Sequence, residues 1–186
     1  VAKWAPNTLS VTYNSQGGSV VSSGSVSTGS AISTAPTQPT RDGYVFNGWF
    51  VASSGGSAIR FPYTPTATSS FTLYAQWSAN TLTVSYDTQG GSTVVNGSVK
   101  TGANILVNPG TPTKSGFTFA GWFTASTGGS ALTFPYTHNQ TANFTLYGQW
   151  SVNTYTVTYK SSPSGTGADI TQSFTYPASI TLKTRA

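Results

Sequence analysis

The chain has 186 residues, contains no cysteine and no methionine, and carries charge on only 6% of its residues. Without cysteine, a disulfide scaffold and a zinc or iron–sulfur site built on thiolates are excluded. The acids are Asp42, Asp87 and Asp169, and the one histidine is His138. Chemistry that needs paired carboxylates or a metal site with several carboxylates therefore has almost nothing to use. We expect no catalytic residue, no cofactor and no metal site.

Eight lysines and arginines against three acids give a net charge of +5. The basic residues are scattered, so the sequence does not predict binding to nucleic acid. No apolar run reaches the roughly 18 residues of a membrane-spanning helix, so membrane insertion is not expected. The chain contains 27 Ser and 32 Thr. A surface rich in hydroxyls and free of sulfur is typical of a protein outside the cell, where oxidation damages Cys and Met.

The first predicted element is a strand that belongs to an incomplete unit. Residues 1–6 include Val1-Ala2-Lys3-Trp4, which aligns with Tyr74-Ala75-Gln76-Trp77 at the end of a later unit. We therefore expect residues 1–6 to be the last strand of a preceding unit.

A first complete unit is predicted over residues 7–79. Leu9, Val11 and Tyr13 alternate with hydroxyl residues, which indicates a half-buried strand. A glycine turn at 16–18 leads to a Ser/Val-rich strand from Val20 to Val26 and on to Ile32. Pro36 and Pro39 break this run and predict an irregular or short helical crossing. Two further strands are expected at 44–50 and 71–77.

The same pattern begins again after 73 residues. Residues 80–152 align with 7–79 without a gap and are identical at 42 of the 73 positions. Residues 153–186 restart the pattern and stop, so they are predicted to be an incomplete third unit. Either the chain is a piece of a longer array, or it shares strands with neighbouring copies.

The expected core consists of apolar residues on these strands and their partners 73 positions later: Leu9, Val11, Ile32, Phe46, Trp49, Phe71 and Leu73. Large aromatic side chains compensate for the small size of each unit. The link between units is only three residues long, at 78–80. So short a link predicts tandem small domains in an elongated, semi-rigid rod.

The segment Gly43-Tyr-Val-Phe-Asn-Gly-Trp-Phe50, followed by Gly55-Gly56 and Phe71-Thr-Leu-Tyr-Ala-Gln-Trp77, resembles the Listeria–Bacteroides repeat, the B-repeat of internalin-type surface proteins. The second unit carries the same motif at 116–123 and 146–150. The resemblance implies a mainly β, β-grasp-like (α+β) small domain in tandem on secreted or wall-attached bacterial proteins. It implies a stalk, spacer or adhesin, without enzymatic activity and without shared catalytic or metal residues.

Few residues suggest binding chemistry. Tyr63 and Tyr136 each lie in a Phe-Pro-Tyr-Thr segment, where an aromatic face could stack on a sugar ring; alternatively they hold a loop over the core. His138 aligns with Pro65 and lies in a polar stretch, so we expect an exposed loop residue. Asp42 and Asp87 adjoin glycine turns and are interpreted as turn-forming residues.

Two functional classes remain. The first is a non-enzymatic extracellular structural module: a stalk, spacer or filament-forming segment of a bacterial surface or adhesin protein, which self-assembles head-to-tail if copies share strands. The second is a multivalent module that binds carbohydrate or a host protein. The expected partners are other repeat units, copies of the chain, the cell wall, glycans or host surface proteins.

Overall fold

The computed structural model describes residue 3, residues 5–160 and residues 169–178. Half of the strand expected at 1–6 lies outside the described residues, and the described residues 3, 5 and 6 are not in a strand. Of the expected third unit, residues 161–168 and 179–186 lie outside the described residues. All regular structure in the described part of the chain is strand. The mainly β prediction is confirmed, whereas the helix that an α+β fold would contain is absent from the described residues.

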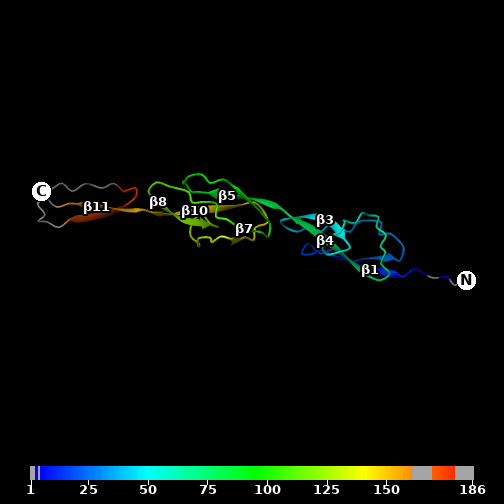
Figure 1. The fold of residues 1–186 in the computed structure, drawn as a ribbon. Helices are drawn as coiled ribbons and strands as arrows, with labels where there is room; N and C mark the ends of the chain where they lie inside the picture. The colour runs from blue at the N-terminus through cyan, green and yellow to red at the C-terminus, as the bar shows by residue number, and fades with distance from the viewer. Residues whose placement is uncertain (1–2, 4, 161–168, 179–186) are drawn as a thin grey trace. The chain divides into compact units, whose positions relative to one another are not determined.

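The first four strands form one mixed sheet in the order β2-β1-β4-β3 (Figure 1). They are β1 (Thr8–Asn14), β2 (Gly24–Ser27), β3 (Tyr44–Phe50) and β4 (Phe71–Ala79). The central strands β1 and β4 are parallel, and β2 and β3 pair antiparallel on either side of them. Parallel neighbours need a long crossover connection, which the intervening 56 residues between β1 and β4 supply.

A second sheet has the same order, β6-β5-β10-β8. Its strands begin 73 positions after those of the first sheet: β5 (Thr81–Asp87), β6 (Gly97–Lys100), β8 (Phe117–Phe123) and β10 (Phe144–Val152). The short strands β7 (Asn104–Ile105) and β9 (Tyr136–Thr137) pair with each other, as Ile32 and Tyr63 do in the first unit.

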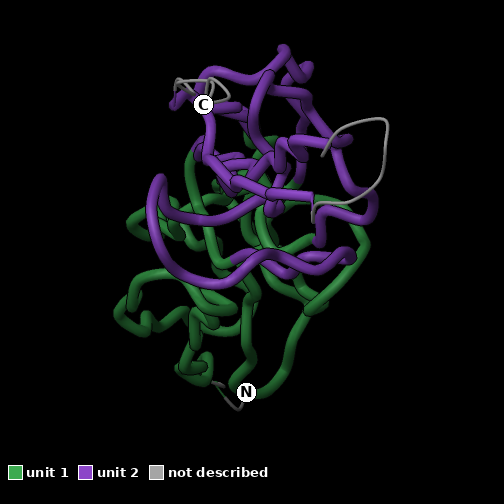
Figure 2. The backbone as a smooth tube through the Cα atoms, turned by 90° about the vertical axis from the view of Figure 1, so that its left-hand side faces the viewer, with its two compact units in different colours: residues 1–82, 100–103, 139–142 green, residues 83–99, 104–138, 143–186 purple. Residues whose placement is uncertain are grey.

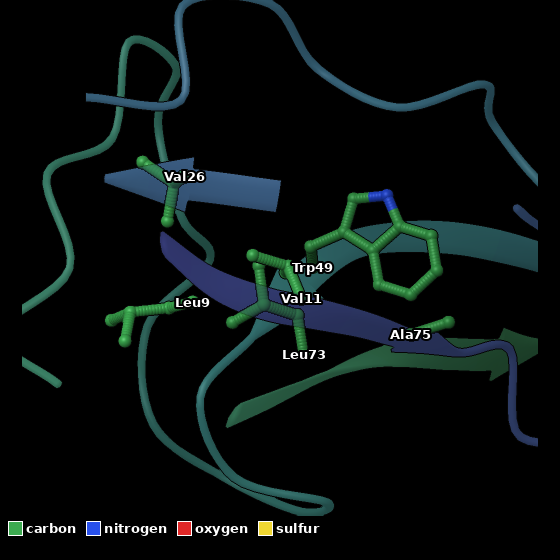
Figure 3. Packing of buried hydrophobic residues seen from close by; sticks show 6 residues of the cluster. All are labelled: Leu9, Val11, Val26, Trp49, Leu73 and Ala75. Carbon is green, nitrogen blue, oxygen red and sulfur yellow. The ribbon is translucent and has the colours of Figure 1, made fainter. Parts of the chain in front are cut away.

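The core lies on one face of each sheet. Leu9 and Val11 of β1 belong to one buried cluster with Leu73 of β4 and Trp49 of β3, and all four are at most 4% exposed (Figure 3). Connecting segments cover this face in place of a helix, through residues packed against the cluster: Val21, Ile32, Ile59, Phe61 and Tyr63. The predicted core is therefore largely right, although Ile32, Phe46 and Phe71 are only half-buried.

The Ser/Val-rich strand predicted from Val20 to Ile32 is much shorter than expected. Only Gly24–Ser27 is strand, and Val20 is 96% exposed. The reason is a competing pair of hydrogen bonds: the Ser19 N–H donates to the Thr40 carbonyl, and the Thr40 N–H donates to the Ser19 hydroxyl. These bonds hold the start of the segment against the loop before β3 instead of against β1.

A β-bulge in β3 places the side chains of Phe46 and Trp49 on the same face of the sheet, toward the core. The register against β4 shifts between Phe46 and Gly48, so Asn47 is the extra residue. Residues three apart on a regular strand face opposite sides, but one extra residue restores the same side. Phe46 and Trp49 therefore pack edge to face, with ring centroids 5.6 Å apart. Gly48 has a φ of +124°, which strongly favours glycine.

The chain consists of two compact units, shown in green and purple in Figure 2. Unit 1 comprises residues 1–82 together with 100–103 and 139–142, and unit 2 comprises 83–99, 104–138 and 143–186. These units follow spatial contacts and cut across the 73-residue repeats, so the division at 79/80 and 152/153 stays a prediction. Below, repeat 1 means residues 7–79 and repeat 2 means residues 80–152.

The last described strands form an antiparallel hairpin of β11 (Thr154–Tyr159) and β12 (Ile170–Thr175). Thr154 faces Thr175 as Thr8 faces Ser27 in the first hairpin. The chain after Asn153 thus repeats the pairing that opens repeat 1.

Candidate functional site

His138 is not the exposed loop residue that the sequence predicted. Its side chain is 4% exposed, and its ring lies 5.2 Å from that of Phe144. The equivalent Pro65 in repeat 1 is buried too. Polar neighbours in the sequence suggested exposure, but the position follows a paired segment on the core face in both repeats: β9 in repeat 2, and the bridge between Ile32 and Tyr63 in repeat 1.

Two of the three acidic residues, Asp42 and Asp87, lie at turns as predicted, and Asp169 lies just before β12. Asp87 and its counterpart Asn14 each accept a hydrogen bond from the backbone N–H two residues further on, at 2.9 Å. This is the geometry of an Asx turn, which either side chain can form. Asp42 is exposed at the turn before β3. Among the described residues, no three His, Cys, Asp or Glu side chains gather as metal ligands do.

Tyr63 and Tyr136 both lie against the core face. Tyr63 is half-buried, exchanges backbone hydrogen bonds with Ile32 and packs edge to face with Phe61. Tyr136 is half-buried in β9, where it pairs with Ile105 of β7. Their positions agree with the alternative in which these residues hold a loop over the core. Their role as sugar-stacking residues stays a prediction.

A polar pocket recurs at the same place in both repeats, and the sequence reasoning missed it. Each pocket has a volume of about 320 Å³ and opens to solvent. The first is lined by Gln16, Arg41, Tyr44, Ser53, Ser54, Gln76 and Trp77, and the second by Gln89, Lys114, Phe117, Ser126, Thr127, Gly128, Gln149 and Trp150. The signal was present in the sequence, since the shared lining positions recur 73 residues apart.

A glutamine turn builds the floor of each pocket. Gln16 and Gln89 have left-handed φ angles of 47° and 49°. The Gln89 side-chain amide donates to the carbonyls of Ser126 and Gly148, at 2.8 and 3.0 Å, and Gln16 makes the equivalent bonds to Ser53 and Ala75. One side chain thereby ties the turn after the first strand to the last strand and to the loop after the third.

One cation lines each pocket. The Arg41 guanidinium donates to the Gln16 carbonyl at 3.2 Å and lies 3.9 Å above the Tyr44 ring. The Lys114 ammonium donates to the Gln89 carbonyl at 2.8 Å and lies 4.5 Å from the Phe117 ring centroid. Both contacts place positive charge on an aromatic face, a favourable electrostatic interaction.

The remaining wall is fixed by hydrogen bonds to backbone carbonyls. The Trp77 indole N–H donates to Ser15 at 2.9 Å, and Trp150 makes the same bond to Thr88 at 2.8 Å. The Gln76 amide donates to Ala52 and Gly55 in the glycine-rich loop. The pocket is therefore a preformed surface, and a ligand would not have to order its walls.

Comparison with known proteins identifies the repeated unit. The sequence model of the Listeria-Bacteroides repeat domain matches residues 10–76 and again residues 83–149. The resemblance inferred from the glycine and tryptophan motif is thereby confirmed, in two tandem copies. In the part of the chain that the structure describes, no helix is long and apolar enough to cross a membrane.

Three relatives cover much of the chain. A "Putative membrane protein" of Evansella cellulosilytica is 36% identical over 97% of the chain, and a "Putative Gly-rich membrane protein" of the same organism is 35% identical over 85%. Internalin H of Listeria monocytogenes is 38% identical over 63%. The chain spans only 27%, 18% and 21% of the lengths of these proteins.

Proposed function

Because the chain belongs to the Listeria-Bacteroides repeat domain family, we propose that it is a non-enzymatic repeat module of a bacterial surface protein, where it acts as an extracellular stalk or spacer. Its similarity to internalin H and to two proteins named as membrane proteins supports a place at the cell envelope. The small share of each relative that the chain covers supports a role as one part of a larger protein.

The observation that carries the spacer proposal is the one-residue link between successive strands. β4 ends at Ala79 and β5 begins at Thr81, so only Asn80 separates them. In unit 1 the Asn80 N–H donates to the Gly43 carbonyl at 2.9 Å, and the Asn80 carbonyl accepts from the Thr101 N–H at 3.0 Å. A link whose backbone donor and acceptor are both bonded has little freedom to bend.

The same arrangement recurs at Asn153 in unit 2. Its N–H donates to Gly116 at 2.9 Å, and its carbonyl accepts from Tyr176 at 3.1 Å. We infer from the two occurrences that tandem repeats join stiffly, which is what a spacer requires.

We also infer that each sheet is a β-grasp-like sheet in which extended segments replace the helix. The order 2-1-4-3 with a parallel central pair supports this inference, as does the core face covered by the crossover connections. Pro36 and Pro39 oppose a helix in that crossover because proline removes a backbone donor and restricts the residue before it.

Light scattering combined with small-angle X-ray scattering over a wide range of concentrations tests the proposal. We expect a monomer at every concentration, with a maximum dimension that corresponds to about 30 Å for each unit. A variant with a flexible Gly-Ser insertion between Ala79 and Asn80 is the matched control, and its scattering should show a broader range of shapes.

Two results would contradict the spacer proposal. A compact particle would mean that the units fold back on each other. A mass that grows with concentration, with filaments under the electron microscope, would instead support head-to-tail assembly by strand sharing.

A further inference from the structure

We propose that the two repeated pockets bind acidic glycans, with one sugar carboxylate or phosphate group held by Arg41 in the first pocket and by Lys114 in the second. This inference does not depend on the spacer role. It also differs from sugar stacking on Tyr63 or Tyr136, since neither residue lines either pocket.

Positive charge is the first part of the argument. Each pocket is lined by one cation and by no carboxylate. An arginine has five N–H donors and a lysine three, so the single bond that each makes to a glutamine carbonyl leaves donors for a ligand. Among the described residues, the recorded ion pair joins Lys160 to Asp169, and it involves neither pocket cation. An anionic group is the natural partner for such a donor.

The surroundings of the cation fit a sugar. Tyr44 and Trp77 line the first pocket, and Phe117 and Trp150 the second, so each offers aromatic surface to the apolar face of a sugar ring. Glutamine side chains and Ser or Thr hydroxyls line the rest of each pocket. The glutamine amide nitrogens already donate to two backbone carbonyls each, so the glutamine oxygens and the hydroxyls are the groups that can bond to sugar hydroxyls. A volume of about 320 Å³ lies at the lower end of the range of small-molecule sites.

A purely structural role for the cation explains the exchange of arginine for lysine between the two pockets less well than anion binding does. Arginine and lysine are not interchangeable where a planar guanidinium must stack or form two parallel bonds. The two repeats nevertheless exchange Arg41 for Lys114 together with Tyr44 for Phe117. The exchange preserves the positive charge at the pocket and one bond to a glutamine carbonyl. Binding an anion requires the positive charge and the N–H donors that remain after the bond to the carbonyl, and both side chains supply these without sharing a shape.

The experiment uses the indole N–H signals of Trp77 and Trp150 in two-dimensional ¹⁵N NMR spectra of the full chain. Trigalacturonic acid provides a carboxylate, a glycerol phosphate trimer provides a phosphate, and galactotriose provides a neutral sugar. We expect at least one acidic probe to shift both indole signals at millimolar concentration, with galactotriose having little effect. The acidic probe that binds more tightly identifies the preferred anion.

The two pockets serve as controls for each other. Arg41→Gln should weaken binding at the first pocket by about tenfold, seen as loss of the Trp77 shift, while the Trp150 shift remains. Lys114→Gln should do the reverse, and Lys114→Arg should retain binding. An unchanged spectrum away from the substituted pocket verifies that each variant is folded.

A control variant distinguishes binding of the acidic probe at the two pockets from nonspecific electrostatic attraction to a positively charged protein. Arg60 and Lys100 are exposed cations outside both pockets, so Arg60→Gln with Lys100→Gln lowers the net charge while leaving the pockets intact. This double variant should bind as the parent chain does. The proposal is overturned if the double variant loses binding to the same extent, if galactotriose shifts the signals equally, or if no acidic probe shifts them.

Discussion

At the scale of single residues, close packing against tryptophan restricts two glycines. A Cβ atom on Gly18 would lie 2.5 Å from Cζ2 of Trp77, and one on Gly91 would lie 2.4 Å from Cζ2 of Trp150. Each indole is held by its N–H bond to a backbone carbonyl, so it cannot move away freely. The glycine turns are therefore needed for space as well as for backbone conformation.

We expect Gly18→Ala to lower the free energy of unfolding by about 1–3 kcal/mol, because the added methyl group overpacks the site. Gly24→Ala is the matched control, since its Cβ would meet Tyr13 at an ordinary 3.6 Å. Urea unfolding followed by tryptophan fluorescence measures both variants. Equal stability of the two would show that the Trp77 indole adapts to the methyl group.

At the scale of elements, the link between the two repeats is shorter than predicted. The sequence predicted a three-residue link at 78–80, and in the structure Asn80 alone separates β4 from β5. β4 extends to Ala79 because its register with β3 continues to Tyr44. Asn7, which precedes β1, shares one feature with the two links at Asn80 and Asn153: the three carbonyls accept from the N–H groups of Thr28, Thr101 and Tyr176, respectively. Each of these asparagines is thus bonded to the end of the hairpin that follows it.

Replacing Asn80 by proline removes the N–H that donates to Gly43, and should lower the free energy of unfolding by at least about 1 kcal/mol. Asn80→Ala keeps that N–H and should change stability much less. Denaturant unfolding compares the two variants. A proline variant as stable as the alanine variant would mean that the backbone bond contributes nothing to the link.

The sequence pattern predicted where strands occur more accurately than it predicted where each strand begins and ends. Alternation identified β1, β3 and β4 because their apolar residues face one core. It failed for the segment from Val20, where valines face solvent and bonds to the loop at Thr40 decide the path. It also treated β3 as a regular strand, since the bulge at Asn47 depends on the register with β4.

At the scale of the whole molecule, the partial burial of two tyrosines should make the free energy of unfolding decrease at alkaline pH. Burial raises the pKa of Tyr13 and of Tyr86 above the ordinary value of 10.0. The folded state therefore holds these protons more tightly than the unfolded state does. Their contribution to stability is complete below pH 10 and is lost as pH rises through the raised folded pKa.

We expect the free energy of unfolding to fall above about pH 10, and to fall less in the double variant Tyr13→Phe with Tyr86→Phe. Tyr155→Phe is the control, because that side chain is 41% exposed. Unfolding curves at several alkaline pH values provide the measurement. An equal alkaline loss in the parent chain and the double variant would contradict this origin.

The sequence by itself determined the repeat, its period, the strands with alternating residues and the family, because these depend on local pattern and on identity between copies. It also placed Asp87 and Asn14 in turns, since an Asx turn is formed within three residues. Only the tertiary structure decided the burial of His138, the bulge at Asn47 and the pockets. Each depends on segments distant in the chain, such as Gln16, Arg41 and Trp77, whose meeting depends on which strands pair and in what register.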